Sequence, residues 1–164
     1  MSKKGVANSN SQSSTMARLT AVQSLYEIDM TSTSIKNILQ DFSEQRWDNN
    51  KILDKLILQK YRLAKPNKTK FTAIITGVMK NQGNIKNILE NAVSENIYLD
   101  KLDRLLKSIL QCGTYEICFD SSTPNKVVIN EYINITLAFY ERNESSLVNG
   151  VLDRIAKIYD MKNK

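Results

Sequence analysis

One stretch, residues 124–139, constrains the fold more than any other: PNKVVINEYINITLAF. Apolar residues occupy every second position along most of it, which is typical of a half-buried β-strand. The run continues to about Tyr140, however, and roughly 17 residues is far longer than the usual strand of 3–10. The letters SST and then Pro124 precede it, and such residues are favoured at helix starts. The stretch is therefore predicted to be an α-helix.

As a helix, the same stretch has a polar stripe and an apolar face. Lys126, Asn130 and Asn134 fall on the stripe, with Glu131 beside them. The apolar face is predicted to enter the core through four residues: Val128, Tyr132, Ile135 and Phe139. We expect Asn130 and Glu131 to make hydrogen bonds that fix the loop before the last helix, and not to form a catalytic pair.

The rest of the chain repeats the helical spacing and leaves no segment that would build a sheet. Residues 1–14 are rich in Ser, Asn and Lys, and are predicted to be a disordered, polar and basic tail. Residues 15–164 are predicted to form one all-α domain of about seven helices. The predicted helices cover residues 16–30, 34–47, 70–82, 84–93, 99–119, 124–140 and 145–159, with a further helical core within 51–65.

Three of these helices carry predictions about packing. In the first, four residues fall at core spacing and four fall outside: Leu19, Val22, Leu25 and Tyr26 against Thr20, Gln23, Ser24 and Glu27. The helix within 99–119 has the broadest apolar surface, so it is predicted to be central and buried on several sides. Gly113 within it, and Gly150 in the last helix, predict close helix crossings, because glycine costs a helix about 1 kcal/mol against alanine.

The sequence contains no histidine and only two cysteines, Cys112 and Cys118. Serine or cysteine catalysis that needs histidine is therefore excluded, a zinc site would lack ligands, and no glycine-rich phosphate loop is present. The cysteines are predicted to be buried free thiols on different faces of one helix. No apolar run approaches the roughly 18 residues of a membrane span, and the polar start is not a secretory signal. We expect a cytoplasmic protein without catalysis, metal or cofactor.

The net charge of +6 is concentrated in three basic blocks. Residues 1–18 carry three basic residues and no acid, residues 51–70 carry seven against one acid, and residues 154–164 carry four against one. Such clusters are the electrostatic footprint of nucleic-acid binding, although lysine-rich faces also occur on proteins that bind none. Charge alone leaves both interpretations open.

Four motifs, in order, resemble the NusB family of transcription antitermination factors: ARLTAVQSLYEIDM, LLKSILQCGTYEI, PNKVVINEYINITLAF and LVNGVLDRIA. They run from about residue 15 to 157, whereas residues 50–70 match nothing specific. The resemblance implies two perpendicular helical bundles and a non-enzymatic protein that binds the boxA RNA of ribosomal RNA operons. It implies that NusE, a ribosomal protein of the small subunit, is the partner, and that the complex helps RNA polymerase to read through terminators.

The resemblance also implies site residues. RNA contacts are expected on the tail, the first helix, the central helix, the helix over 124–140 and the loop before the last helix: Lys3, Lys4, Arg18, Gln23, Lys107, Gln111, Lys126 and Asn143. Contacts with NusE are expected at Tyr26 and Leu147, each of which also suits a core position. The alternative for Arg18 is an ordinary solvated helix residue.

Three positions depart from the family pattern. The first helix keeps only Arg18 of several arginines, Gln111 stands where many relatives carry arginine, and Asn143 stands where an acid is common. Removing one phosphate interaction with a single strand flattens the slope of log K against log salt by about 0.7, whereas replacing an acid removes repulsion. We therefore expect RNA binding that depends on NusE and on polar contacts more than is usual in the family.

Two alternatives come from other classes of protein. Some ribosomal-RNA cytosine methyltransferases carry a NusB-like domain, but a chain that ends at Lys164 without a glycine-rich methyl-donor loop is not expected to perform that reaction. The other alternative is a helical adaptor that binds only protein, and the basic blocks argue mildly against it.

Overall fold

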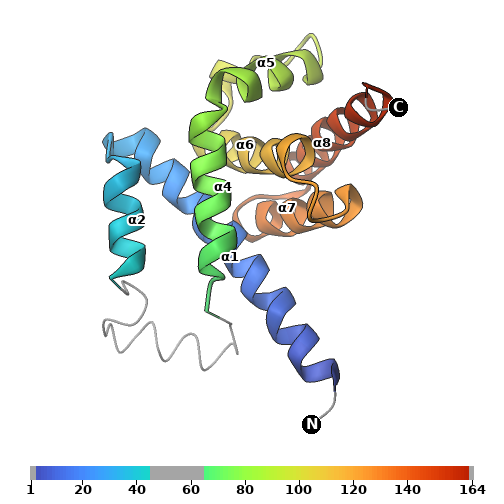
Figure 1. Ribbon diagram of the computed structural model, residues 1–164. Coiled ribbons are helices and arrows are strands. Elements are labelled where there is room, and N and C mark those ends of the chain that lie inside the picture. The colour runs from blue at the N-terminus through green and yellow to red at the C-terminus, as the bar shows by residue number, and fades with distance from the viewer. Residues whose placement is uncertain (1–2, 45–64, 163–164) are drawn as a thin grey trace. The chain divides into compact units, whose positions relative to one another are not determined.

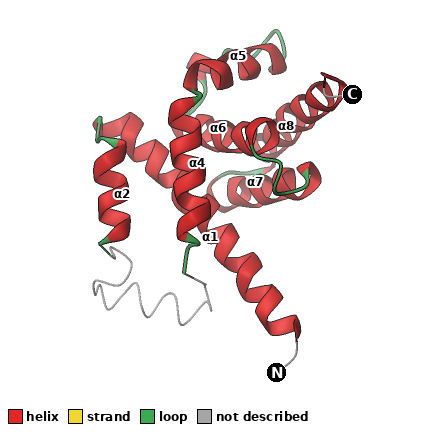
Figure 2. Ribbon diagram, in the orientation of Figure 1, coloured by secondary structure: helices red, strands yellow, loops and turns green. Residues whose placement is uncertain are grey.

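The computed structural model describes residues 3–44 and 65–162, which are helical apart from short connections (Figure 1 and Figure 2). These residues form seven α-helices, one short 3₁₀ helix and no strand, so the all-α prediction is confirmed. In chain order the elements are α1 (Lys3–Thr31), α2 (Ile35–Ser43), α4 (Lys68–Lys80), α5 (Gln82–Ala92), η1 (Leu99–Lys101), α6 (Arg104–Phe119), α7 (Asn125–Phe139) and α8 (Arg142–Lys162).

The chain divides into two compact units, residues 1–73 and 74–164, with the boundary inside α4. The helical core predicted within 51–65 lies outside the described residues, except for Lys65. None of the helices in the two described ranges is both long enough and apolar enough to cross a membrane.

Two helices begin earlier than the sequence predicts. α1 begins at Lys3, so residues 3–14 are helical, whereas their composition predicts a disordered tail. These residues contain no proline, and a helix nucleated by the apolar part that follows can extend back through them. α8 begins at Arg142, so Asn143 lies in its first turn and not in a loop before it.

In the first unit, α2 and the start of α4 are held by a few specific contacts. The hydroxyl of Ser13 on α1 donates to the carbonyl of Lys65 at 2.8 Å, and the backbone N–H of Asn67 donates to the carbonyl of Ser13 at 3.0 Å. The rings of Phe42 on α2 and Phe71 on α4 stack with their centroids 4.2 Å apart. The start of α4 is thereby fixed to both α1 and α2.

The buried face of α1 differs from the predicted one. Thr20 and Ser24 are predicted to lie outside but are buried, whereas Tyr26, at core spacing, is 37 % exposed. The Thr20 hydroxyl donates to the carbonyl of Met16 at 2.7 Å, so its burial leaves no hydroxyl unsatisfied. Apolar spacing alone misplaces this face, because small hydroxyl side chains can be buried when the helix backbone accepts their hydrogen bond.

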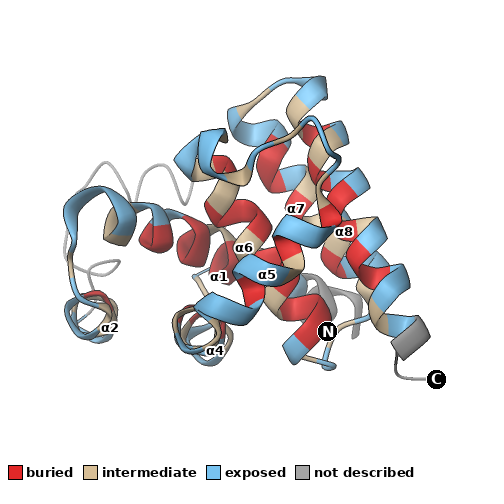
Figure 3. Ribbon diagram, turned by 90° about the horizontal axis from the view of Figure 1, so that it is seen from above, coloured by how far each residue is buried: buried red, intermediate tan, exposed pale blue. Residues whose placement is uncertain are grey.

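The second unit is built around α6, which packs against α5, α7 and α8 (Figure 1). Most of its residues are buried, as predicted for a central helix, and Figure 3 shows buried positions along the facing sides of α6, α7 and α8. At Gly113 a Cβ would lie 2.8 Å from Cδ1 of Leu152 on α8, which confirms the close crossing predicted there. At Gly150 a Cβ would meet nothing within 4 Å, so the crossing predicted at that position is wrong.

α7 confirms that the stretch 124–139 is a helix. Val128, Tyr132 and Ile135 enter the core as predicted, but Phe139, the last residue of α7, is 43 % exposed. The Tyr132 hydroxyl donates to a carboxylate oxygen of Glu116 on α6 at 2.6 Å. A polar contact therefore joins the two helices inside an otherwise apolar core.

Both cysteines of α6 are buried free thiols, as predicted. Burial, with the nearby charge of Glu116 as a second cause, raises the pKa of the Cys112 thiol well above its ordinary value. Because the thiolate is the reactive form, Cys112 is a structural residue and not a nucleophile.

Candidate nucleic-acid interface

The residues expected to contact RNA or NusE lie in four places. In the first unit they lie on α1, and in the second unit they lie on α6, on the first turn of α7 and on the first two turns of α8. Lys3 and Lys4 fall in the first turn of α1, and their side chains lie outside what the structure describes.

On α1, exposure separates the three remaining candidates. Gln23 and Tyr26 are exposed, so both side chains can reach a partner, and the core alternative for Tyr26 is wrong. Arg18 is only 3 % exposed and interacts with another group of the protein, so the alternative of a solvated helix residue is also wrong. Contact between Arg18 and RNA stays a prediction, and it requires the guanidinium to leave its present surroundings.

On α6, Lys107 and Gln111 lie one turn apart and line a cavity of about 210 Å³. α5 contributes Gln82 and Lys86 to the same cavity, and η1 contributes Asp100. Two ammonium groups and two amides face one carboxylate, so donors predominate and the cavity suits a phosphate better than a cation. We name it the lysine cavity.

Sequence reasoning missed Gln82 and Lys86. Their spacing of four residues places both on one side of α5, but nothing in that helix indicates that this side faces Lys107. Lys86 also lies 3.8 Å from Glu90 on α5, and both side chains are well exposed. Exposed pairs of this kind are weak, so Lys86 remains available to a phosphate.

The turn between α7 and α8 is tied to the start of α6. Tyr140, directly after α7, donates its hydroxyl to the carboxylate of Asp103, which caps α6. This hydrogen bond, followed by those from backbone N–H groups of α6, holds the pKa of Asp103 below its ordinary value. Asn143 and Phe139 are exposed on either side of the turn, and Leu147 is half-buried one turn further along α8.

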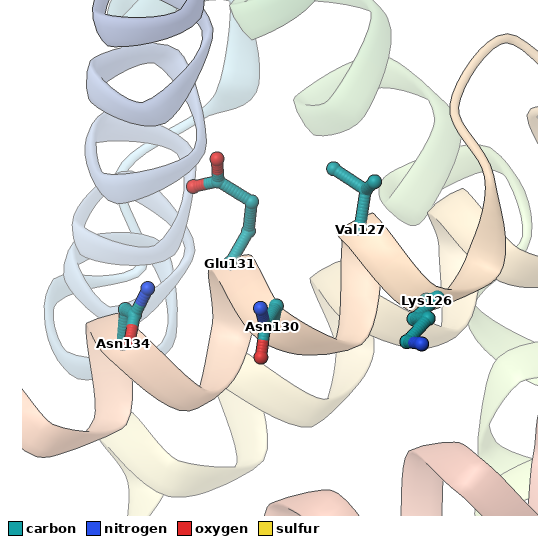
Figure 4. A pocket seen from close by; sticks show the side chains of 5 residues that line it. All are labelled: Lys126, Val127, Asn130, Glu131 and Asn134. Atoms are coloured by element: carbon teal, nitrogen blue, oxygen red, sulfur yellow. The ribbon is translucent and has the colours of Figure 1, made fainter.

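The polar stripe of α7 is present as predicted. Lys126, Asn130 and Asn134 lie in a row along the helix with Glu131 beside them, and they line a cavity of about 350 Å³ (Figure 4). Lys126 precedes the end of α7 by about 20 Å at the rise of an α-helix, so the fold does not bring it to Asn143. Asn130 lies more than two turns before the α7–α8 turn, and a hydrogen bond from Asn130 or Glu131 to that loop stays a prediction. The hydrogen bond that anchors the turn comes from Tyr140.

No group of three or more His, Cys, Asp or Glu side chains that could hold a metal occurs within residues 3–44 and 65–162. The candidate site consists instead of lysine, amide and aromatic side chains on the surfaces of helices. Fold and surface together define the class as an all-helical binding protein.

Residues 15–157 match the NusB family, and the chain belongs to that family. Similar relatives are named transcription antitermination protein NusB. The one from Caulobacter vibrioides is 32 % identical over 146 residues, which are 89 % of this chain and 93 % of the relative. The one from Mesorhizobium japonicum is 36 % identical over 86 % of each chain. The protein is therefore an antitermination factor by family and not an enzyme.

Solved structures agree with this assignment. NusB of T. maritima superposes with a TM-score of 0.64 at 25 % identity, over 91 % of this chain and 94 % of that one. A structure of the antitermination factors NusB and NusE in complex with double-stranded RNA gives a TM-score of 0.64 at 21 % identity, over 88 % of this chain and 96 % of that one. At that identity the second likeness is one of fold.

Proposed function

We propose that this protein binds the boxA RNA of ribosomal RNA operons together with NusE, and that the complex helps RNA polymerase to read through terminators. The family match over residues 15–157 carries the proposal, because it includes every candidate contact residue except Lys3 and Lys4. The complex of a structural neighbour with NusE and RNA supports the choice of both partners.

The lysine cavity is the part of the surface that best suits the RNA backbone. Lys107 and Lys86 supply two point charges from two different helices, and Gln82 and Gln111 supply amide donors between them. Phosphate contacts of this kind position RNA without reading its sequence. Sequence preference for boxA must then come from side chains that meet the bases, for which the exposed Gln23 and Asn143 are candidates.

The burial of Arg18 bears on what NusE contributes to RNA binding. Arg18 is the sole arginine of the first helix and is buried, so its guanidinium offers RNA little positive charge where it lies. NusE, with Tyr26 and Leu147 as the candidate residues that contact it, would add RNA contacts of its own. RNA affinity should therefore rise when NusE is present.

Transcription in a purified system tests the proposal. A template carries boxA upstream of a terminator, and a second template carries a scrambled boxA in the same position. We expect this protein with its own NusE and the other transcription factors to raise read-through on the first template only. Equal read-through on both templates, or no effect of omitting this protein, would overturn the proposal.

A further inference from the structure

A second cavity of the second unit is distinct from the lysine cavity. It is a groove of about 460 Å³ between α5, the end of α6 and the end of α8, a volume typical of small-molecule sites. Its character comes from three amides and an apolar, partly aromatic surface: Asn84, Asn87 and Asn91 on α5, Phe119 on α6, and Ile158 and Tyr159 on α8. No charged side chain is among the described residues that line it.

The amides of the groove are available to a ligand. Asn84, Asn87 and Asn91 recur at spacings of three and four residues, which places them along one edge of α5. All three are exposed, and their side chains have no hydrogen-bond partner within the described parts of the chain. Each amide offers two N–H donors and one oxygen acceptor.

Opposite these amides lies exposed apolar surface. Phe119 is 41 % exposed and Ile158 is 40 % exposed, although both belong to helices whose other apolar residues are largely buried. The Phe119 ring lies beside the ring of Tyr115, with the centroids 6.2 Å apart and the planes nearly parallel. A flat ligand can stack its face on such a ring while its edge pairs with the amides.

The three amides and the apolar surface together indicate which kind of ligand fits the groove. Without a charged lining residue, the groove offers a phosphate or a carboxylate amide donors but no positive charge to offset the loss of its hydration. An apolar helix could fill it, but the amides would then lose water without gaining partners, which is costly. A neutral heterocycle with donors and acceptors satisfies both parts, because asparagine pairs with base edges and aromatic rings stack on base faces.

We propose that the groove receives an unpaired nucleobase of the bound RNA. The inference rests on the proposed function and adds a base-binding site to it. α5 borders both cavities, because Gln82 and Lys86 line the lysine cavity and its three asparagines line the groove. This arrangement favours a base that belongs to an RNA strand over a free base. An α-helix is about 10–12 Å across with its side chains, so a few nucleotides of an extended strand can cross α5 and place phosphate on one side and a base on the other.

Side-chain amide signals in NMR spectra of the ¹⁵N-labelled protein report directly on the three asparagines. We expect these signals to shift when single-stranded boxA RNA is added, and to stay in place when adenosine or cytidine is added at the same concentration. Equal shifts with a free nucleoside would assign the groove to small metabolites and overturn the proposal. Shifts caused by NusE in the absence of RNA would overturn it in favour of a protein contact.

A double variant, Asn87→Ala with Asn91→Ala, tests how much the amides of the groove contribute to the free energy of RNA binding. We expect it to weaken RNA binding about fivefold or more, as loss of a bidentate amide contact with a base edge does, with the salt slope unchanged because every phosphate contact stays in place. Asn149→Ala, an exposed asparagine on α8 outside the groove, is the matched control. RNA binding by the double variant equal to that of the control would overturn this inference alone, whereas a wild-type protein without RNA affinity would overturn the proposed function as well.

Discussion

The hydroxyl of Tyr132 on α7 donates a hydrogen bond of 2.6 Å to Glu116 on α6, and both side chains are buried. α6 carries Lys107 and Gln111, and α7 carries Lys126, so this bond fixes two of the helices that present candidate contacts with RNA. In a low-dielectric core, removing such a donor from a carboxylate lowers the free energy of unfolding. The pair is therefore a structural determinant of the binding surface.

Replacement Tyr132→Phe should lower the free energy of unfolding by about 1–3 kcal/mol, the usual cost of leaving a buried acceptor short of a partner. Urea denaturation followed by circular dichroism measures the change. Tyr98→Phe is the matched control, because Tyr98 is exposed and its ring faces the ammonium of Lys101. The idea fails if the two variants have the same stability.

Two glycine substitutions should change stability in opposite directions. Gly113→Ala places a methyl group 2.8 Å from Leu152 Cδ1, so overpacking should destabilise the protein by about 1–3 kcal/mol, less the gain in helix propensity. Gly150→Ala meets nothing within 4 Å and should stabilise it by about 0.5–1 kcal/mol. Thermal unfolding of both variants decides the matter, and a change of the same sign in both would contradict the packing described here.

The hydrogen bond from Tyr140 to Asp103 should make stability depend on pH. Because the pKa of Asp103 is lowered in the folded state, its stabilisation is fully present above the unfolded pKa of about 3.9 and is lost as the pH falls through the lower folded value. Tyr140→Phe should cost about 0.5–1 kcal/mol at pH 7, a modest value because Asp103 is exposed. Denaturation at pH 7 and pH 3 compares variant with wild type, and an equal difference at both pH values would rule out this carboxylate as the cause.

Lysine substitutions should distinguish lysines that contact RNA phosphates from lysines that do not. Lys107→Ala should weaken binding to single-stranded RNA and flatten the slope of log K against log salt by about 0.7. Lys157→Ala is the control, because Lys157 pairs with Asp153 at 2.9 Å on α8 and does not line the lysine cavity. Titrations at three or more salt concentrations give both slopes. If Lys157→Ala flattens the slope as much as Lys107→Ala, the lysine cavity has no special role.

The sequence predicts the helices of this protein better than their exposed faces. The length of the stretch 124–139 predicts α7 as a helix against its strand-like alternation, although Pro124 is itself the N-cap and no Ser/Thr side chain caps this helix. The faces depend on what packs against each helix. Thr20 can be buried because Met16 accepts its hydrogen bond, and Gly150 has open space above it although a close crossing is predicted there as at Gly113.

The candidate site is likewise predicted from the sequence only in part. Motif resemblance singled out Lys107 and Gln111 one by one, but only the fold places Gln82 and Lys86 beside them, because α5 and α6 meet through tertiary packing. The groove between α5, α6 and α8 has no sequence motif at all. Its exposed Phe119 belongs by spacing to the apolar surface of α6, and periodicity cannot indicate that this surface extends beyond the core at the end of the helix.

Fluorescence anisotropy with labelled boxA RNA and a scrambled control measures directly whether this protein recognises boxA. The protein is titrated alone and with its own NusE, at two salt concentrations. We predict binding that is selective for boxA, tightens when NusE is present and weakens as salt rises. Equal, weak binding to both RNAs under all conditions would contradict this prediction, and would leave a NusB fold that serves as an adaptor between proteins.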